Sequence, residues 1–421
     1  MSKKLYAVLS LLLAAAFLVS ACGGNATATE PQQAATEAPA MTEAPEMTEA
    51  PAMTEAPAMT DAPADNGLGE YGLPDYYPAD YTSIIEGSQQ EMETVSDGLL
   101  VYSIMGENNW APILEAFYAK YPWMDGKVTA LDLGSYEVFE RYYSESASNA
   151  RTGDMIITSS YDAWQEFISK GNLVEYTSPE DANVPDWSKL APSLYTASSD
   201  PMLIIYNKQL VSDAPSSMAD LAALIEADPD TYKGKITTYD AINNATGFAI
   251  NWFWLKQNGE DGWATLEKIG QSTPTRQSSA GNMANSVIAG EALAGYFVSA
   301  ISVFSKFPDA EAVLGWNYIT DGQPILVRGM GITTAAAAPN SAKLLMDFIL
   351  SGEGQVALSQ GGLTAYREDI ADQAKSHLST IADAVGEENL VFFNLDPDLT
   401  DQAKKDAFLE RWDKAVPAPA Q

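Results

Sequence analysis

Downstream of Tyr77, short apolar runs alternate with longer amphipathic segments, and this alternation restricts the fold more than any other feature of the chain. Short apolar runs predict strands, whereas apolar positions that recur every three or four residues predict helices. The predicted strands cover residues 99–104, 154–158, 201–206, 235–238 and 293–298. The predicted helices cover residues 110–121, 161–170, 217–227, 247–257, 282–292 and 340–351. Strands separated by helices predict an α/β fold with mainly parallel sheets. Asn340 or Ser341 is the expected cap of the last helix, and Gly352 is its expected end.

The N-terminal segment has the pattern of an export signal. Two lysines precede an apolar stretch over residues 5–19, and small residues then lead to Cys22, the only cysteine in the chain. The stretch is shorter than the roughly 20 residues of a membrane-spanning helix. The run Val-Ser-Ala-Cys22 resembles the end of a bacterial lipoprotein signal peptide. This resemblance implies that residues 1–21 are removed, that Cys22 is lipidated, and that the protein is anchored outside the cytoplasmic membrane. The alternative is an ordinary secreted protein.

A low-complexity segment follows this signal. From Met41 to Ala64 the chain repeats Met-Thr-Glu-Ala-Pro with one variable residue, and Asp61 replaces the glutamate in the last unit. The repeat has no aromatic or β-branched aliphatic residue that could build a core, so residues 22–76 are predicted to form a disordered acidic spacer. Proline and repelling carboxylates keep such a spacer extended. A ligand-binding repeat array is the rival interpretation, and O-glycosylation of the threonines stays open.

Charge and size narrow the class of protein further. The chain has 57 acidic and 23 basic residues and a formal charge of −34, which makes nucleic acid a poor partner. A single cysteine leaves no intramolecular disulfide, so packing must stabilise the fold. About 340 residues remain after the signal and spacer, which is enough for two lobes.

Polar residues follow the predicted strands. In open α/β sheets the ligand lies beyond the carboxyl ends of the strands, where loops enter helices. Hydroxyls, amides and glycines there can present donors to an anion, although Ser, Thr and Asn are also the usual helix caps. The candidate ligand-binding residues in these loops are Ser103, Gly106, Glu107, Ser159, Ser160, Asn244, Thr246, Gly247 and Ser299. Arg276, in a predicted polar loop, is a further candidate for pairing with an anion, with a solvated surface arginine as the alternative.

Six motifs in order resemble the extracellular solute-binding proteins of ABC importers, in particular their iron(III)-type branch. The resemblance covers roughly residues 77–370. Its motifs are Tyr77-Pro78-Ala79-Asp80-Tyr81, Gly153-Asp154-Met155-Ile156-Ile157, Leu203-Ile204-Ile205-Tyr206-Asn207-Lys208, Lys233-Gly234-Lys235-Ile236, Ala289-Gly290-Glu291-Ala292 and Leu350-Ser351-Gly352-Glu353-Gly354-Gln355.

The resemblance implies a two-lobed periplasmic-binding-protein-like fold of type II that closes over a solute by hinge motion. Lobe 1 would comprise residues 77–204 and 332–365, and lobe 2 residues 205–331 and 366–421 with the C-terminal helices. The chain would cross between lobes near Tyr206, which joins the candidate ligand-binding residues, and return over residues 327–331. Such a protein works as a monomer beside an ABC permease, and neither a cofactor nor a resident metal is expected.

The sequence restricts the identity of the solute less than it restricts the class of protein. Ferric-binding members carry two adjacent tyrosines after the strand that here ends at Val298, and this chain has none there, which argues against bare ferric iron. The loop from Asn244 to Gly247 resembles a helix-start anion site of those relatives. An organic anion (phosphate, phosphonate or carboxylate) or anion-chelated ferric iron is therefore expected. A polyamine is the alternative, with Glu107, Asp162 and Asp240 as partners for ammonium groups and Trp110 as a cation-π face.

An enzyme, namely a secreted lipoprotein hydrolase, is the alternative from another class. The only histidine, His377, lies in a polar stretch and is expected to be exposed. The chain has no G-x-S-x-G elbow, no H-E-x-x-H and no P-loop. Paired carboxylates stay open as a catalytic device in so acidic a chain. The sequence therefore favours binding over catalysis.

Overall fold

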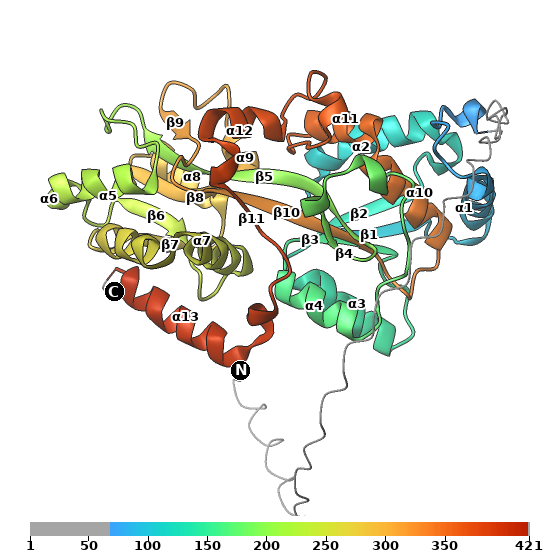
Figure 1. Cartoon of the computed structure of the whole chain (residues 1–421), viewed down its shortest axis with the longest axis horizontal. Coiled ribbons are helices and arrows are strands. Elements are labelled where there is room, and N and C mark those ends of the chain that lie inside the picture. The colour runs from blue at the N-terminus through green and yellow to red at the C-terminus, as the bar shows by residue number, and fades with distance from the viewer. Residues whose placement is uncertain (1–67, 420–421) are drawn as a thin grey trace, which may run out of the picture. The chain divides into compact units, whose positions relative to one another are not determined.

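The computed structural model describes residues 68–419. Within them, eleven strands form one sheet whose main path runs β2-β1-β3-β10-β5-β8-β6-β7 (Figure 1). Beside this path, β11 pairs with β10, and both β4 and β9 pair with β5. The strands are β1 Leu99–Ser103, β2 Val128–Asp132, β3 Met155–Thr158, β4 Lys189–Ala191, β5 Leu194–Asn207, β6 Ile236–Tyr239, β7 Thr275–Gln277, β8 Ala294–Ser299, β9 Leu314–Asn317, β10 Gln323–Ile332 and β11 Leu390–Phe392.

Helices cover both faces of the strands. Figure 1 shows α3, α4, α7 and α13 below the strands, with α2, α11 and α12 above them. The helices are α1 Thr82–Thr94, α2 Glu107–Lys120, α3 Glu137–Ala147, α4 Tyr161–Ser169, α5 Met218–Ala227, α6 Pro229–Tyr232, α7 Ala245–Gly270, α8 Ala280–Ile288, α9 Ala300–Phe304, α10 Pro339–Leu350, α11 Gly352–Gln360, α12 Leu378–Val385 and α13 Gln402–Ala415. None of those between residues 68 and 419 is both long and apolar enough to cross a membrane.

Two long strands connect two groups of parallel strands. β1 pairs in parallel with β2 and β3, and β6 pairs in parallel with β7 and β8. β10 is antiparallel to β3, and β5 is antiparallel to both β10 and β8. β5 pairs with β10 up to Pro201 and with β8 from Met202 onward. The exchange of partners thus falls between these two residues, and the pairing of β10 with β5 shifts register between Val327 and Gly329.

The alternation of strands and helices predicted from the sequence is confirmed. The largest difference is the strand predicted over residues 201–206, which begins at Leu194 in the structure. Its first half contains Ser198, Ser199 and Asp200, and their polarity concealed the strand in the sequence. All three are fully buried and hydrogen-bonded. Buried polar groups are tolerated in a strand when each has a partner.

The helix predicted over residues 247–257 is also longer than expected. It continues as α7 to Gly270, and the chain bends inside it at Gly259, whose φ is 55°. A positive φ is strained for residues with a side chain, so glycine permits this bend. The bend brings the second half of α7 along the same side of the molecule as α13 (Figure 1).

The start of α10 corrects the predicted cap. Asn340 and Ser341 were expected to cap this helix, but it begins at Pro339, and both residues lie inside its first turn. The carboxylate of Glu91 in α1 accepts hydrogen bonds from the backbone N–H of Asn340 at 2.9 Å and of Ser341 at 2.8 Å. A carboxylate from another helix thus takes the place of a local cap. Its negative charge also interacts favourably with the positive end of the dipole of α10. Gly352, the expected end, begins α11 instead.

The spacer predicted to end at residue 76 ends earlier. Leu68 is fully buried and Leu73 nearly so, and the hydroxyls of Tyr76 and Tyr77 donate to the buried carboxylate of Glu180. These apolar and aromatic residues are of the kinds that build a core and that the sequence of the repeat does not contain. The expected lipidation site at Cys22, the signal peptide and the repeat itself lie outside the described residues.

The C-terminal helix α13 packs against α7. The ring of Phe408 contacts Phe248 and Trp252 with centroid distances of 5.6 and 5.0 Å. A methyl group added to Gly270 at the end of α7 would lie 1.8 Å from the carbonyl oxygen of Ala415, so only glycine allows this approach. The docking fixes where the side chains of α13 lie relative to the start of α7.

Candidate functional site

Four strand-to-helix loops carry most of the predicted site residues. β1 leads into α2, β3 into α4, β6 into α7, and β8 into α9. In each case the chain leaves the carboxyl end of a strand and starts a helix, the place where α/β proteins bind ligands. The structure sorts these loops into two groups, because the starts of α4 and α7 are connected through Lys405, whereas the starts of α2 and α9 line a common cavity.

The loop before α4 contains two buried hydroxyl groups. Ser159 and Ser160 are each 2% exposed, and neither hydroxyl has a hydrogen-bond partner among the described residues. Ser160 precedes the first residue of α4 but does not cap it with its side chain. The next residue, Tyr161, donates its hydroxyl to the carbonyl of Val327 in β10 at 2.7 Å. This hydrogen bond holds the start of α4 against β10, and the hydroxyls of Ser159 and Ser160 stay without a partner among the described residues.

The loop before α7 is built around Asn244 and Gly247. The side-chain oxygen of Asn244 accepts from the N–H of Gly247 at 2.8 Å, and its amide donates to the carbonyl of Ser278 at 3.0 Å. A methyl group on Gly247 would come within 2.8 Å of the Cβ of Tyr239, so this position excludes a larger residue. Thr246 lies half-buried in the first turn of the helix. Capping, the alternative considered from the sequence, is thus the role of Asn244 in the structure.

Lys405 of α13 connects these two helix starts. Its ammonium lies 3.0 Å from Oδ2 of Asp162 in the first turn of α4. It also lies 4.8 Å from the ring centroid of Phe248 in the first turn of α7, within the range of a cation-π contact. The hydroxyl of Tyr136 donates to the same oxygen of Asp162 at 2.8 Å. Burial, and then the charge of Asp162, raises the pKa of Tyr136, so the phenol stays a donor.

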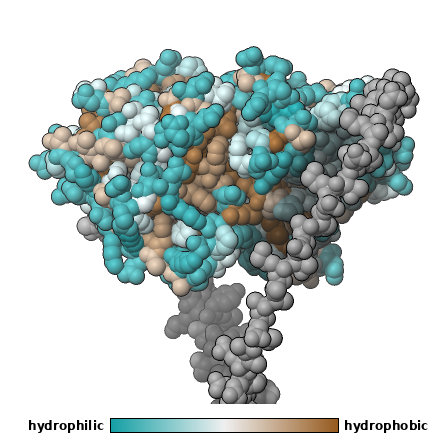
Figure 2. All heavy atoms as spheres, in the orientation of Figure 1, coloured by the Kyte–Doolittle hydropathy of each residue, from teal (hydrophilic) through white to brown (hydrophobic). Residues whose placement is uncertain are grey.

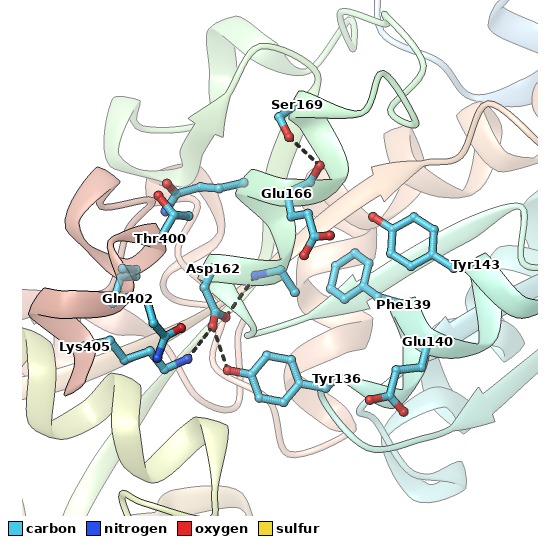
Figure 3. Close-up of a pocket in the computed structure, with 13 residues that line it drawn as sticks. Tyr136, Phe139, Glu140, Tyr143, Asp162, Glu166, Ser169, Thr400, Gln402 and Lys405 are labelled. Carbon is cyan, nitrogen blue, oxygen red and sulfur yellow. Dashed lines mark hydrogen bonds and ion pairs between the residues drawn. The ribbon is translucent and has the colours of Figure 1, made fainter. Parts of the chain in front are cut away.

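A cavity of about 700 Å³ opens beside this ion pair (Figure 3). Figure 3 shows the carboxylate of Asp162 between Tyr136 and Lys405, with Tyr143 and Glu166 farther along. Its lining comes from α3, α4, the turn Pro397–Thr400 and α13. The lining residues are Tyr136, Phe139, Glu140, Tyr143, Asp162, Ala163, Gln165, Glu166, Ser169, Leu399, Thr400, Gln402 and Lys405.

A second cavity of about 770 Å³ adjoins the other two loops. Asn108 and Asn109 of the first turn of α2 form one wall, and Ile301 and Phe304 of α9 form another. The turn at residues 359–362, after α11, closes a third side. Three predicted site residues lie beside this lining in sequence, namely Gly106, Glu107 and Ser299.

Figure 2 shows hydrophilic residues over much of this face of the molecule, with hydrophobic residues gathered near its middle. Figure 1 draws β10 and β11 there, between α7 and α4. Beneath the surface, the buried rings of Tyr161, Phe253 of α7 and Phe393 lie against one another, with centroids 5.2 to 6.0 Å apart. An apolar contact therefore joins α4 to α7.

Two predicted site residues have their polar groups occupied. The hydroxyl of Ser103 donates to the carbonyl of Leu131 at 3.2 Å and accepts from the indole N–H of Trp110 at 3.0 Å. Arg276 lies in β7 rather than in a loop, and its guanidinium donates to the carbonyl of Val416 and to the carboxylate of Asp413. It also lies over the ring of Trp412. In the structure both residues hold elements of the fold together.

Two further expectations differ from the structure. Tyr206 was expected where the chain crosses, but it lies near the end of β5, paired with Ala294 of β8, and its ring covers Gly315 of β9. His377 was expected to be exposed, yet it is only 5% exposed. Its Nδ1 lies 2.8 Å from the hydroxyl of Ser379, and its Nε2 lies 2.9 Å from the carbonyl of Arg367. These contacts occupy both ring nitrogens.

Sequence reasoning missed Lys405, Tyr136 and Phe248. Tyr136 ends the loop from β2 to α3, which was not among the loops predicted from the sequence, whereas Phe248 lies inside α7 and Lys405 inside α13. Lys405 reaches the site only because α13 docks on α7, and no local pattern announces that contact. Among residues 68–419, no group of three or more His, Cys, Asp and Glu side chains is placed to hold a metal ion.

Residues 125–383 match the family model of the bacterial extracellular solute-binding proteins. This match covers more than half of the 421 residues, so the chain belongs to that family. The family resemblance inferred from the sequence is thereby confirmed, and membership implies that the protein works outside the cytoplasm. No curated protein matches this chain.

Solved structures of related proteins show the same fold. The substrate-binding protein of an ABC transporter from Agrobacterium tumefaciens is 21% identical, with a TM-score of 0.65 over 77% of this chain and 96% of its own. The periplasmic binding protein AfuA from Actinobacillus pleuropneumoniae, with fructose-6-phosphate bound, is 19% identical, with a TM-score of 0.58 over 75% and 98% of the two chains. Iron-bound HitA from Pseudomonas aeruginosa is 17% identical, with a TM-score of 0.51 over 62% and 83%. These likenesses confirm the two-lobed α/β fold.

Proposed function

We propose that this chain is the membrane-tethered solute-binding component of an ABC importer. It captures a small organic anion, or ferric iron chelated by one, through hinge closure, and it performs no chemistry on the solute. The observation that carries this proposal is the family match over residues 125–383, together with two groups of parallel strands connected through β5 and β10. The hinge lies where β5 exchanges partners between Pro201 and Met202, and the protein acts as a monomer that delivers its solute to a permease.

The chemistry beside the first cavity supports an anion. Ser159 and Ser160 hold buried hydroxyls without partners just before α4. A buried donor without a partner lowers the stability of the protein, and an anion could accept hydrogen bonds from these two. The starts of α4 and α7 add helix dipoles whose positive ends favour negative charge. Two carboxylates considered for a polyamine are already engaged, since Asp162 pairs with Lys405 and Asp240 accepts from the N–H of Ile242. The anion is therefore favoured over the polyamine.

Changing Thr246 to Asp should damage solute binding without damaging the fold. The new carboxylate would stand in the first turn of α7 and repel an anion, so affinity should fall by more than tenfold, or about 1.4 kcal/mol. The same charge suits the helix dipole, so the melting temperature without solute should not fall. Isothermal titration calorimetry with fructose 6-phosphate, inorganic phosphate and spermidine measures the effect. Thr246→Asn is the matched neutral control.

The outcome of this series decides the class of solute. If Thr246→Asp binds the anions as well as the wild type does, the anion proposal fails. If the wild type binds only spermidine, and Thr246→Asp binds it more tightly, the polyamine importer becomes the working function. If no probe is bound and a hydrolytic activity copurifies with the chain, the solute-binding role itself is wrong.

The tether is tested separately from the solute. Cys22→Ser should abolish lipid attachment and cleavage at this position, because only a cysteine thiol can carry the lipid in a lipoprotein signal. Mass spectrometry of the N-terminus and metabolic labelling with a fatty acid measure both events. Solute affinity should be unchanged, since every residue of the candidate site lies between residues 68 and 419. Continued labelling of the variant at its N-terminus would contradict the lipoprotein assignment.

A further inference from the structure

Lys405 holds a position in the first cavity that the other lining residues do not share. It is the only lysine or arginine among them, whereas Glu140, Asp162 and Glu166 are all carboxylates. Without its ammonium, the lining would repel an anion from every charged group that it contains. Lys405 is therefore the one lining side chain that attracts an anion, although Lys170, outside the lining, also neutralises Glu166.

The position of Lys405 is set by the packing of α13. Phe408, one turn further along the helix, contacts the rings of Phe248, Trp252 and Trp263 of α7. The ammonium thus stays beside the start of α7 whenever α13 is docked there. Its partner Asp162 belongs to α4, which follows β3 of the first group of parallel strands, whereas α7 follows β6 of the second group.

The ion pair between these side chains is replaceable. The side chains of Lys405 and Asp162 are 24% and 19% exposed, so water screens their attraction in part. Asp162 retains other partners if Lys405 leaves it, because Tyr136 donates to Oδ2 and the N–H of Ala163 donates to Oδ1 at 2.9 Å. An anionic group that reaches the ammonium of Lys405 can accept from it a charge-assisted hydrogen bond of the same kind as the one that Asp162 accepts. When a solute replaces Asp162 as the partner of Lys405, both the ammonium and the carboxylate therefore keep hydrogen-bond partners.

We propose that Lys405, delivered by the C-terminal helix, is the residue that selects the charge of the solute, and that Asp162 holds its ammonium until the solute arrives. This inference rests on the proposed capture of an anion. The bound anion takes the place of Asp162 beside Lys405, in the first turn of the helix that follows the unpartnered hydroxyls of Ser159 and Ser160. The C-terminal helix thereby becomes part of the binding site, although it lies far from the strand-to-helix loops in sequence.

Calorimetric titration of the purified protein with fructose 6-phosphate and with inorganic phosphate tests this role. Lys405→Ala should weaken binding of the anion by at least tenfold, and Lys405→Arg should keep it within a few-fold of the wild type. Asp162→Asn should tighten binding severalfold, because the ammonium no longer has to leave a carboxylate. Lys404→Ala is the matched control: it removes the same charge from the preceding residue of α13, which is exposed and paired with Asp398.

Each outcome has a distinct meaning. Equal anion affinity in Lys405→Ala and the wild type overturns the role of Lys405 and leaves the proposed function intact. A loss of affinity in Lys404→Ala as large as in Lys405→Ala shows that only net charge matters, which also overturns the role. Weaker anion binding in Asp162→Asn contradicts the exchange of partners. A wild type that binds spermidine but neither anion overturns the anion class and this inference together. Melting temperatures without solute, which should barely change, exclude a purely structural effect.

Discussion

Replacing Arg328 with Met should remove roughly 3 to 5 kcal/mol from the free energy of unfolding, because it breaks a buried ion pair and leaves one charge behind. Arg328 of β10 pairs with Asp200 of β5, and their side chains are 7% and 0% exposed. Asp200 also accepts from the hydroxyl of Ser198 at 2.8 Å and from the N–H of Thr364 at 3.0 Å. These neutral donors cannot replace the guanidinium in a site without water. Burial lowers the pKa of Arg328 to about 10, which leaves it charged at pH 7.

Urea unfolding followed by tryptophan fluorescence measures this loss. The double variant Arg328→Met with Asp200→Leu removes both charges and should recover most of the stability, since apolar replacements of a buried pair are often neutral. A single variant that loses less than about 1 kcal/mol would show that the pair is solvated in solution. The pair lies at the register shift of β10, beside the residues where β5 changes partners. The variants therefore also report how the connecting strands depend on it.

Protein stability should fall as the pH rises from 5 to 8, and Asp347 should be a main cause. Asp347 of α10 is 1% exposed, and its carboxyl group accepts from the hydroxyls of Tyr81 at 2.7 Å and of Ser178 at 2.6 Å. Burial outweighs these donors and raises its pKa from 3.8 to about 7. The folded state thus binds this proton more tightly than the unfolded chain. The resulting stabilisation is complete below pH 4 and is lost as the pH rises through 7.

The expected loss from this residue is about 3 kcal/mol between pH 5 and pH 8. Asp347→Asn has nearly the same shape and no titrating proton, so its stability should change less over the same range. The difference between wild type and variant, measured by urea unfolding at several pH values, isolates Asp347 from the other acidic groups. A difference that stays constant from pH 5 to pH 8 would mean that Asp347 titrates at its ordinary pKa.

The sequence predicted the fold better than the site, and particular residues show why. Ser103 and Ser159 stand at equivalent places, each at or just after the end of a parallel strand. Their surroundings differ, because the hydroxyl of Ser103 is engaged by Leu131 and Trp110, whereas that of Ser159 has no partner among the described residues. Local polarity cannot distinguish these two cases, since the partners come from other elements.

Long-range docking accounts for the other differences. Arg276 has polar neighbours in sequence, so it was a candidate for pairing with an anion, with a solvated surface arginine as the alternative, but the end of α13 covers it. The same helix brings Lys405 to the cavity. Both facts depend on how α13 packs on α7, through aromatic residues whose pairing is not visible in a linear sequence. Hydrophobic periodicity, in contrast, is local and strong, and it located the predicted strands and helices within a few residues, with β5 and α7 as the exceptions.

The hydrogen bonds of the N-terminal arm have a mechanical consequence. Leu68 is buried, and Tyr76 and Tyr77 donate to Glu180, which also pairs with Arg367. Tension on the chain upstream of residue 68 therefore acts first on this arm and on the helices α1 and α10 beside it. If the chain is tethered as proposed, a pull on it therefore loads this arm before it loads the point between Pro201 and Met202 at which β5 exchanges partners, where we place the hinge.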